Sequence, residues 1–142
     1  PEARELECAV LGNEDPVVSL PGEIVSTGQF YDYAAKYLDT DSKLIIPASL
    51  TEEQTNQIKK LAITAFQAID CAGMARVDFL MNGTSGQLFL NEINTIPGFT
   101  TISMYPKLWE ASGLSYSSLL DQLIELAVDR HASKQSLKTS QD

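Results

Sequence analysis

Residues 75–94, ARVDFLMNGTSGQLFLNEIN, contain the pattern that decides the fold. Strand-like runs of apolar and β-branched residues flank residues 82–86, which are polar and contain two glycines. Two such runs around a short glycine-containing loop are typical of a β-hairpin. If the strands pair symmetrically about Thr84, Arg76 lies opposite Glu92 and Asp78 lies opposite Leu90.

The hairpin should have one polar face and one apolar face, because side chains two residues apart on a strand point the same way. The predicted polar face carries Arg76, Asp78, Glu92 and Asn94. The predicted core face carries Val77, Phe79, Met81, Phe89 and Ile93.

An amphipathic helix is predicted before the hairpin. Thr51 and Gln54 fit a capping box, in which the two residues satisfy each other's backbone N–H groups. Apolar residues then follow at spacings of three and four: Ile58, Leu61, Ala62, Ala65, Phe66 and Ile69. Gly73 stands where such a helix commonly ends.

The rest of the chain predicts an α+β fold with a mostly antiparallel sheet and packed helices. Short strands are expected at residues 5–11, 17–18, 23–25 and 44–46. After a loop over residues 94–105, Pro106 can open a short helix that ends before Gly113. A last helix is expected over residues 119–127, and residues 131–142 form a polar, loose tail.

Residues 27–43 have no regular period and hold three of the five tyrosines, together with Lys36. Long loops in compact domains are often lids over a binding site. Lys36, flanked by Tyr33 and Tyr37, could reach a phosphate, and an ordinary loop lysine explains it equally well.

Length and charge limit the possible functions. At 142 residues the chain is expected to be one domain. Its net charge of −9 argues against a general nucleic-acid binder, which needs a basic face, but leaves a nucleotide ligand open. No run approaches the length of a membrane span. Cys8 and Cys71 show no metal spacing and are expected to be free thiols in a reducing cytoplasm.

The predicted polar face has the chemistry of a metal–phosphate site. Glu92, Asn94 and Asp78 offer hard oxygen ligands of the kind that Mg²⁺ uses beside substrate phosphates. Arg76 can neutralise charge on a transferred group. A solvated polar sheet face is the alternative. Gly98, after Pro97, is open to two readings, an oxyanion donor or a simple turn.

Three segments resemble the D-alanine–D-alanine ligases of the ATP-grasp superfamily: FYDYAAKY at residues 30–37, ARVD at residues 75–78, and NEINTIPGFTTISMYPKLW at residues 91–109. The resemblance implies that residues 1–130 are the C-terminal part of the ligase domain, an ATP-grasp subdomain. It implies ATP-dependent joining of two D-alanines through D-alanyl phosphate, for peptidoglycan precursor synthesis.

The same resemblance assigns the metal and phosphate roles. Asp78, Glu92 and Asn94 match the ligands of two Mg²⁺ ions, for which Mn²⁺ can substitute, and Glu92 matches the ligand that bridges them. Arg76 matches the arginine at the transferring phosphate. Lys36 matches a lid lysine on the γ-phosphate of ATP.

Further roles follow around the substrates. Gly98 matches the glycine whose N–H completes the oxyanion hole, and Ser103 matches the residue that holds the carboxylate of the second D-alanine. Tyr37 matches a lid tyrosine that hydrogen-bonds into the substrate site. Glu5 matches the acidic residue on the ATP ribose.

The main departure is length, because family members have an N-terminal domain and a first ATP-grasp subdomain ahead of this segment. The chain, which begins at Pro1 without a Met, is therefore expected to be the back part of a longer, homodimeric, cytoplasmic enzyme and to be inactive alone. Two alternatives stay open: a D-alanine–D-lactate ligase, against which Lys36, Tyr37 and Met104 argue, and a non-catalytic ATP-grasp-like binding module. A generic acidic interaction domain would explain the charge but not the polar face.

Overall fold

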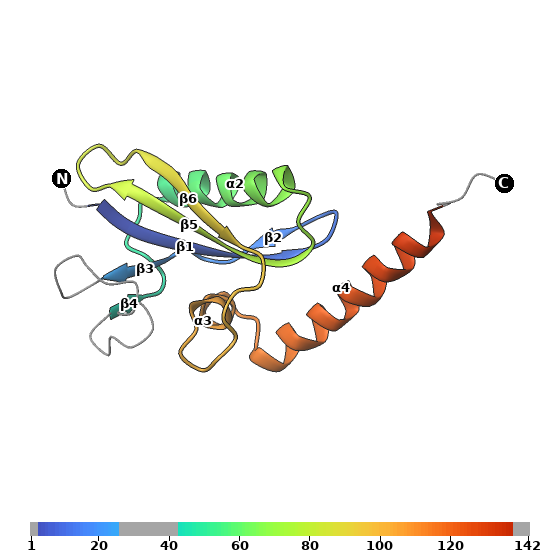
Figure 1. Ribbon diagram of the computed structural model, residues 1–142. Helices are drawn as coiled ribbons and strands as arrows, with labels where there is room; N and C mark the ends of the chain where they lie inside the picture. Colours follow the sequence, from blue (N-terminus) through green and yellow to red (C-terminus); the bar gives the residue numbers. More distant parts are fainter. Residues whose placement is uncertain (1–2, 26–42, 138–142) are drawn as a thin grey trace.

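The computed structural model describes residues 3–25 and 43–137, which form one antiparallel sheet with helices on both sides (Figure 1). The strands are β1 (Ala3–Gly12), β2 (Val17–Val18), β3 (Gly22–Val25), β4 (Lys43–Ile45), β5 (Gly73–Asn82) and β6 (Leu88–Asn94). The helices are α2 (Glu52–Ala68), α3 (Met104–Ala111) and α4 (Tyr116–Ser136). The predicted lid, with Lys36 and Tyr37, lies outside the described residues.

The sheet has the order β4-β3-β1-β5-β6, and β2 pairs with β1 outside this path. All of these pairs are antiparallel. β1 is therefore a central strand, and it pairs with β5 along its full length from Ala3 to Gly12. The predicted α+β fold with a mostly antiparallel sheet is confirmed.

Helix α2 covers one face of the sheet. Thr51 caps it as predicted: the Thr51 hydroxyl accepts from the Gln54 N–H, and the Gln54 side chain accepts from the Thr51 N–H. Ile58, Ala62 and Phe66 are buried against the odd-numbered residues of β5. The helix ends at Ala68, before the predicted end at Gly73, because Asp70 turns the chain with a positive φ of 52°.

Helix α3 covers part of the opposite face, where Tyr105 and Leu108 pack on Ala9 and Leu11 of β1. The buried Tyr105 hydroxyl donates to the Val10 carbonyl at 3.0 Å. The helix begins at Met104, two residues before the predicted start at Pro106. Pro106 is tolerated in the first turn because N–H groups there have no partner within the helix.

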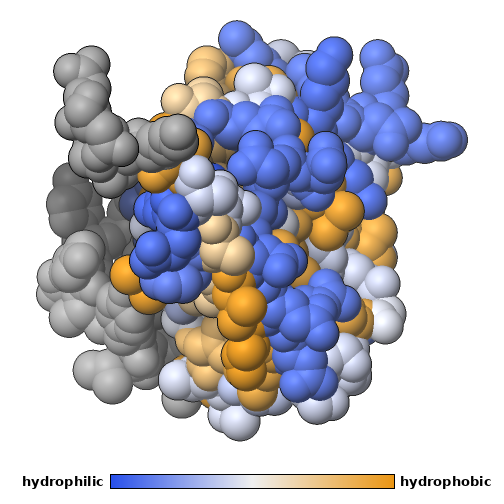
Figure 2. Space-filling view, turned by 90° about the vertical axis from the view of Figure 1, so that its right-hand side faces the viewer, coloured by the Kyte–Doolittle hydropathy of each residue, from blue (hydrophilic) through white to orange (hydrophobic). Residues whose placement is uncertain are grey.

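Helix α4 packs on α3 and beside the ends of β1 and β5 as far as Arg130, and its last turns extend beyond the sheet (Figure 1). It continues past Arg130 to Ser136, so the structure is helical in residues 131–136 where a loose tail was predicted. Figure 2 shows the side of the molecule toward which α4 extends. Hydrophilic residues cover much of this side, and hydrophobic residues form patches between them. None of the helices in the described part of the chain is long and apolar enough to cross a membrane.

Candidate functional site: a carboxylate cluster on the open face of the sheet

The hairpin forms as predicted, but its register differs. Its loop is closed by the Asn82 N–H, which donates to the Gln87 carbonyl at 2.9 Å, and the Asn82 side chain accepts from the N–H groups of Thr84 and Ser85. Arg76 lies opposite Asn94 and Asp78 lies opposite Glu92. The predicted pairs Arg76–Glu92 and Asp78–Leu90 are therefore wrong.

A β-bulge at Asn91 explains both the register and the polar face. Asp78 pairs with Glu92, but the next residue, Phe79, pairs with Leu90, so Asn91 has no partner on β5. Without this extra residue, the pairing that begins at Met81 and Leu88 would place Glu92 on the α2 side of the sheet. The bulge turns Glu92 to the side of the sheet opposite α2, beside Asp78. The part of this side that α3 does not cover is called the open face.

The pairing next to the hairpin loop also corrects one predicted core residue. Phe89 pairs with Leu80, whose side chain points away from α2, and half of Phe89 is exposed. Val77, Phe79 and Met81 are buried on the α2 side, and Ile93 packs against them. Phe89 is therefore not part of the core face that the alternation predicted.

The four predicted polar residues are brought together on one face. The Arg76 guanidinium donates from Nε and from Nη2 to the two carboxylate oxygens of Asp78, at 2.8 Å each. The Asn94 amide donates to Asp78 Oδ2 and to Glu92 Oε1, at 3.1 Å each. A chain of polar contacts thus runs from Arg76 through Asp78 and Asn94 to Glu92.

Burial and the neighbouring charges shift the pKa of Asp78. Asp78 is only 1% exposed, and burial is the largest of the effects that raise the pKa of its carboxyl. The neighbouring Glu92 charge raises that pKa further, while Arg76 lowers it. In return, the hydrogen bonds to Asp78 raise the pKa of Arg76. Arg76 is therefore a permanent cation beside two carboxylates that repel each other.

The donor set fits Mg²⁺. It combines two carboxylates and a carboxamide, which are hard oxygen ligands. A divalent cation between Asp78 and Glu92 would offset the burial and repulsion that disfavour their ionised forms. The Asn94 amide must turn to present its oxygen. Among residues 3–25 and 43–137, no three His, Cys, Asp or Glu side chains gather as a further metal site.

Sequence reasoning missed Glu7, which lies opposite Asp78 on the central strand β1. It is only 3% exposed, and its Oε2 lies 3.1 Å from Arg76 Nε. The signal was present in the sequence: Glu5 and Glu7 alternate with the apolar residues of the same strand. Glu5 is half-buried on the same face, opposite Leu80.

Gly98 and Ser103 also come together, in the loop between β6 and α3. A Cβ on Gly98 would lie 2.9 Å from Ser103 Oγ, so a side chain at Gly98 would displace this hydroxyl. Ser103 Oγ accepts from the Thr100 N–H at 2.9 Å and lies 2.9 Å from the Thr100 hydroxyl. The loop therefore fixes the Ser103 hydroxyl next to the Gly98 backbone.

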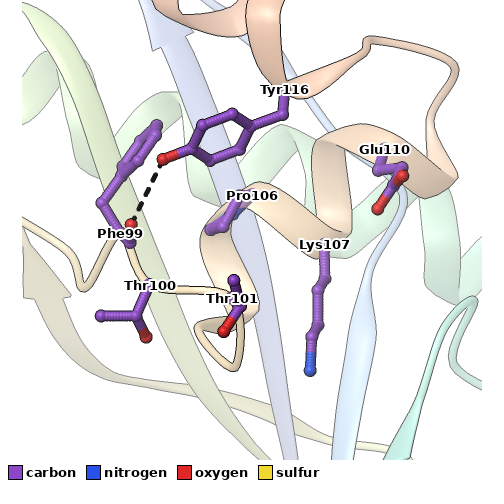
Figure 3. Close-up of a pocket in the computed structure, with 7 residues that line it drawn as sticks. All are labelled: Phe99, Thr100, Thr101, Pro106, Lys107, Glu110 and Tyr116. Carbon is purple, nitrogen blue, oxygen red and sulfur yellow. Dashed lines mark hydrogen bonds between the residues drawn. The ribbon is translucent and has the colours of Figure 1, made fainter.

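A cavity of about 560 Å³ adjoins this loop (Figure 3). It lies between Phe99–Thr101 and the start of α3 and α4, and Lys107 and Glu110 give it polar edges. The Tyr116 hydroxyl on its wall donates to the Phe99 carbonyl at 3.5 Å, which ties α4 to the loop (Figure 3).

Comparison with known proteins gives the family. The model of the D-ala D-ala ligase C-terminus matches residues 1–125. The chain belongs to this family. A D-alanine--D-alanine ligase of Thermoanaerobacter sp. (strain X514) is 62% identical over 134 residues, which are 94% of this chain and 37% of that relative.

Solved structures of the family have the same fold. The D-alanine-D-alanine ligase from Coxiella burnetii aligns with a TM-score of 0.80 and 50% identity, over 95% of this chain and 35% of that one. The D-alanine--D-alanine ligase from Bacillus anthracis, solved in complex with ATP, aligns with a TM-score of 0.76 and 28% identity, over 94% and 42%. The fold is thus that of the C-terminal ATP-grasp subdomain, and the chain spans about a third of these relatives.

Proposed function

We propose that this chain is the C-terminal catalytic part of an ATP-dependent ligase that joins two D-alanines. The observation that carries the proposal is the cluster of Asp78, Glu92, Asn94 and Arg76, which the bulge at Asn91 gathers on the open sheet face. Membership of the D-alanine ligase family supports the choice of reaction. Residues 1–130 form this part, and the preceding parts of a homodimeric enzyme complete the site.

The cluster supplies the phosphoryl-transfer half of the reaction. Asp78, Glu92 and Asn94 would hold two Mg²⁺ ions, or Mn²⁺ in their place, and Glu92 would be the ligand common to both. When bound, the ions neutralise phosphate charge and align the γ-phosphoryl group of ATP. Arg76 donates hydrogen bonds to the γ-phosphoryl group during its transfer to the carboxylate of the first D-alanine. This transfer yields D-alanyl phosphate and ADP. Lys36 of the lid binds the γ-phosphate.

The remaining residues act on the sugar and the amino acids. Glu5 accepts hydrogen bonds from the ribose hydroxyls of ATP. Ser103 donates to the carboxylate of the second D-alanine, and Tyr37 hydrogen-bonds into the same site. The Gly98 N–H donates to the oxyanion that forms when the amine of the second D-alanine attacks the acyl phosphate. Phosphate then leaves, and the amine loses a proton.

The cytoplasm is the proposed location, because it supplies ATP and keeps thiols such as Cys8 and Cys71 reduced.

The test is a product assay on the full-length protein that carries this segment. With ATP, Mg²⁺ and D-alanine, we expect one D-alanyl-D-alanine, one ADP and one phosphate per turnover. D-Lactate in excess should not replace the second D-alanine. The 142-residue chain alone is the matched control and should bind Mg-ATP weakly and make no dipeptide. If the full-length protein releases no ADP in response to D-alanine, the proposal is wrong.

A further inference from the structure

A buried acid on the central strand stands beside the arginine of the cluster. Glu7 is 3% exposed, pairs with Asp78 in the β1–β5 register, and places Oε2 3.1 Å from Arg76 Nε. The proposed reaction gives Glu7 no role, although a carboxylate is costly to bury on a central strand.

Arg76 is shared unequally between its two acidic neighbours. Its Nε–H and one Nη2–H are both directed at Asp78, at 2.8 Å, while Glu7 attracts the same Nε by charge from 3.1 Å. The side chain of Arg76 is 21% exposed and that of Asp78 is 2% exposed. Water therefore has little access to the Arg76–Asp78 pair, and a hydrogen bond that breaks there is not readily replaced by one to water.

Cation binding at Asp78 conflicts with this arrangement. A carboxylate whose two oxygens both accept from one guanidinium has fewer lone pairs for a metal, and Asn94 also donates to Oδ2. When Asp78 turns to a cation, Arg76 loses at least one acceptor. Glu7 is already within reach of the Nε that is released.

We propose that Glu7 is a positioning residue that takes over the Nε–H of Arg76 when a divalent cation engages Asp78. Glu7 thereby keeps the guanidinium on the open face, with its Nη atoms directed at the transferred phosphate. This role rests on the proposed function. Glu7 is not itself a ligand in this scheme, because Arg76 occupies the space beside it and the described residues contain no group of three acidic, His or Cys side chains able to hold a metal.

A direct test is a crystal structure of the full-length wild-type protein with Mg²⁺ and ADP. The proposal predicts a hydrogen bond from Arg76 Nε to Glu7, with at least one Asp78 oxygen on the metal and released from Arg76. It is overturned if Arg76 still donates both N–H groups to Asp78 in the metal-bound state, or if the guanidinium leaves Glu7. This measurement needs no variant and no turnover.

Variants test the consequence for cation affinity. Glu7→Gln keeps the shape but loses the charge, so Arg76 should stay on Asp78 and compete with the cation. Loss of a residue that supports a metal ligand typically weakens metal binding ~10–100-fold. We expect Mn²⁺ binding in the presence of ADP, followed by electron paramagnetic resonance, to weaken by about tenfold, and kcat to fall while the KM for D-alanine is unchanged.

Two controls separate positioning from charge and from stability. Glu7→Asp keeps the charge but withdraws the carboxylate from Arg76, so it should behave like Glu7→Gln; wild-type Mn²⁺ affinity in Glu7→Asp would overturn the proposal. Glu23→Gln breaks another buried acid–arginine pair of the sheet, with Arg4, and should leave Mn²⁺ affinity unchanged. Absence of dipeptide synthesis by the wild type would refute the proposed function alone, because the Mn²⁺ comparison tests Glu7 independently.

Discussion

The α2 side of the sheet and the uncovered part of the opposite side are built from the same strands but bury different kinds of side chain. On the α2 side, β1 and β5 bury Leu6, Cys8, Val10, Ala75, Val77, Phe79 and Met81. On the other side, α3 covers Ala9 and Leu11 of β1. The part of that side that α3 leaves uncovered, called the charged face, buries Glu7 and Asp78 beside Arg76. Strand alternation places these two sets back to back, one residue apart in sequence.

Apolar burial and buried ion pairs contribute very differently to the free energy of unfolding. Burial of apolar surface stabilises the fold by ~25 cal/mol per Å². A buried ion pair contributes little on balance, because the cost of removing two charges from water offsets their attraction. We therefore infer that the apolar packing under α2 and α3 holds the fold together and that the charged face is kept for its chemistry. The following substitutions act on one face and should leave the other unchanged.

The largest expected effect is on the α2 face. Phe66 is fully buried, and Phe66→Ala should leave a cavity under the sheet that costs ~3–5 kcal/mol of unfolding free energy. Urea denaturation of the 142-residue chain measures it. A loss below ~1 kcal/mol would mean that this face is not the main source of stability.

On the charged face, the proposed function predicts that Glu92→Gln reduces kcat of the full-length protein by ~10²–10³, or about 3–4 kcal/mol of transition-state stabilisation. The exposed carboxylate is replaced by a neutral group of the same shape, so unfolding of the chain should be unchanged. Steady-state kinetics at saturating Mg-ATP measure both constants. A near-normal kcat would show that Glu92 does not bridge the metals.

Ser103→Ala should act on substrate binding. The hydroxyl that Thr100 and Gly98 hold in place would be lost. Under the proposed function, one hydrogen bond to the carboxylate of the second D-alanine, worth ~1.5–3 kcal/mol, is lost with it. We expect a higher KM for the second D-alanine at nearly unchanged kcat. A fall in kcat with constant KM would instead place Ser103 in the transition state.

The smallest effect is at the helix cap of the α2 face. Thr51→Ala removes the acceptor for the Gln54 N–H and should cost ~1 kcal/mol of unfolding free energy. The rate of dipeptide synthesis proposed for the full-length protein should not change. Thermal unfolding measures the loss of stability. Glu53→Ala is the control, because it removes a nearby exposed polar side chain and leaves the cap in place.

The sequence was sufficient for features that depend on local pattern. The capping box at Thr51, the amphipathic α2 and the shared face of Arg76 and Asp78 follow from spacing alone. Glu92 and Asn94 also share a face by spacing, but the bulge is what brings that face to the side of Arg76 and Asp78. The register of the hairpin could not be predicted, because Leu88 and Ile93 both pack on the α2 side although they are five residues apart, and only the bulge at Asn91 allows this. No single-strand pattern marks such a residue.

Glu7 was missed for a different reason. An acidic residue in an alternating strand usually reaches water at a sheet face, and its burial depends on the central position of β1 between β3 and β5. Strand order is a tertiary property that spacing does not contain. The helical residues 131–136 were missed because polar residues tolerate a helix as well as a tail.

The contrast between the faces is tested most directly by replacing the whole buried charge group with apolar residues. The triple variant Glu7→Met, Arg76→Met and Asp78→Leu replaces all three charged residues of this buried group and leaves only the exposed Glu92. The unfolding free energy of the chain should therefore stay the same or rise, by up to ~1–4 kcal/mol. Dipeptide synthesis by the full-length triple variant should be undetectable. A triple variant that loses several kcal/mol of stability in urea denaturation would contradict the inference, because the charged face would then be holding the fold together.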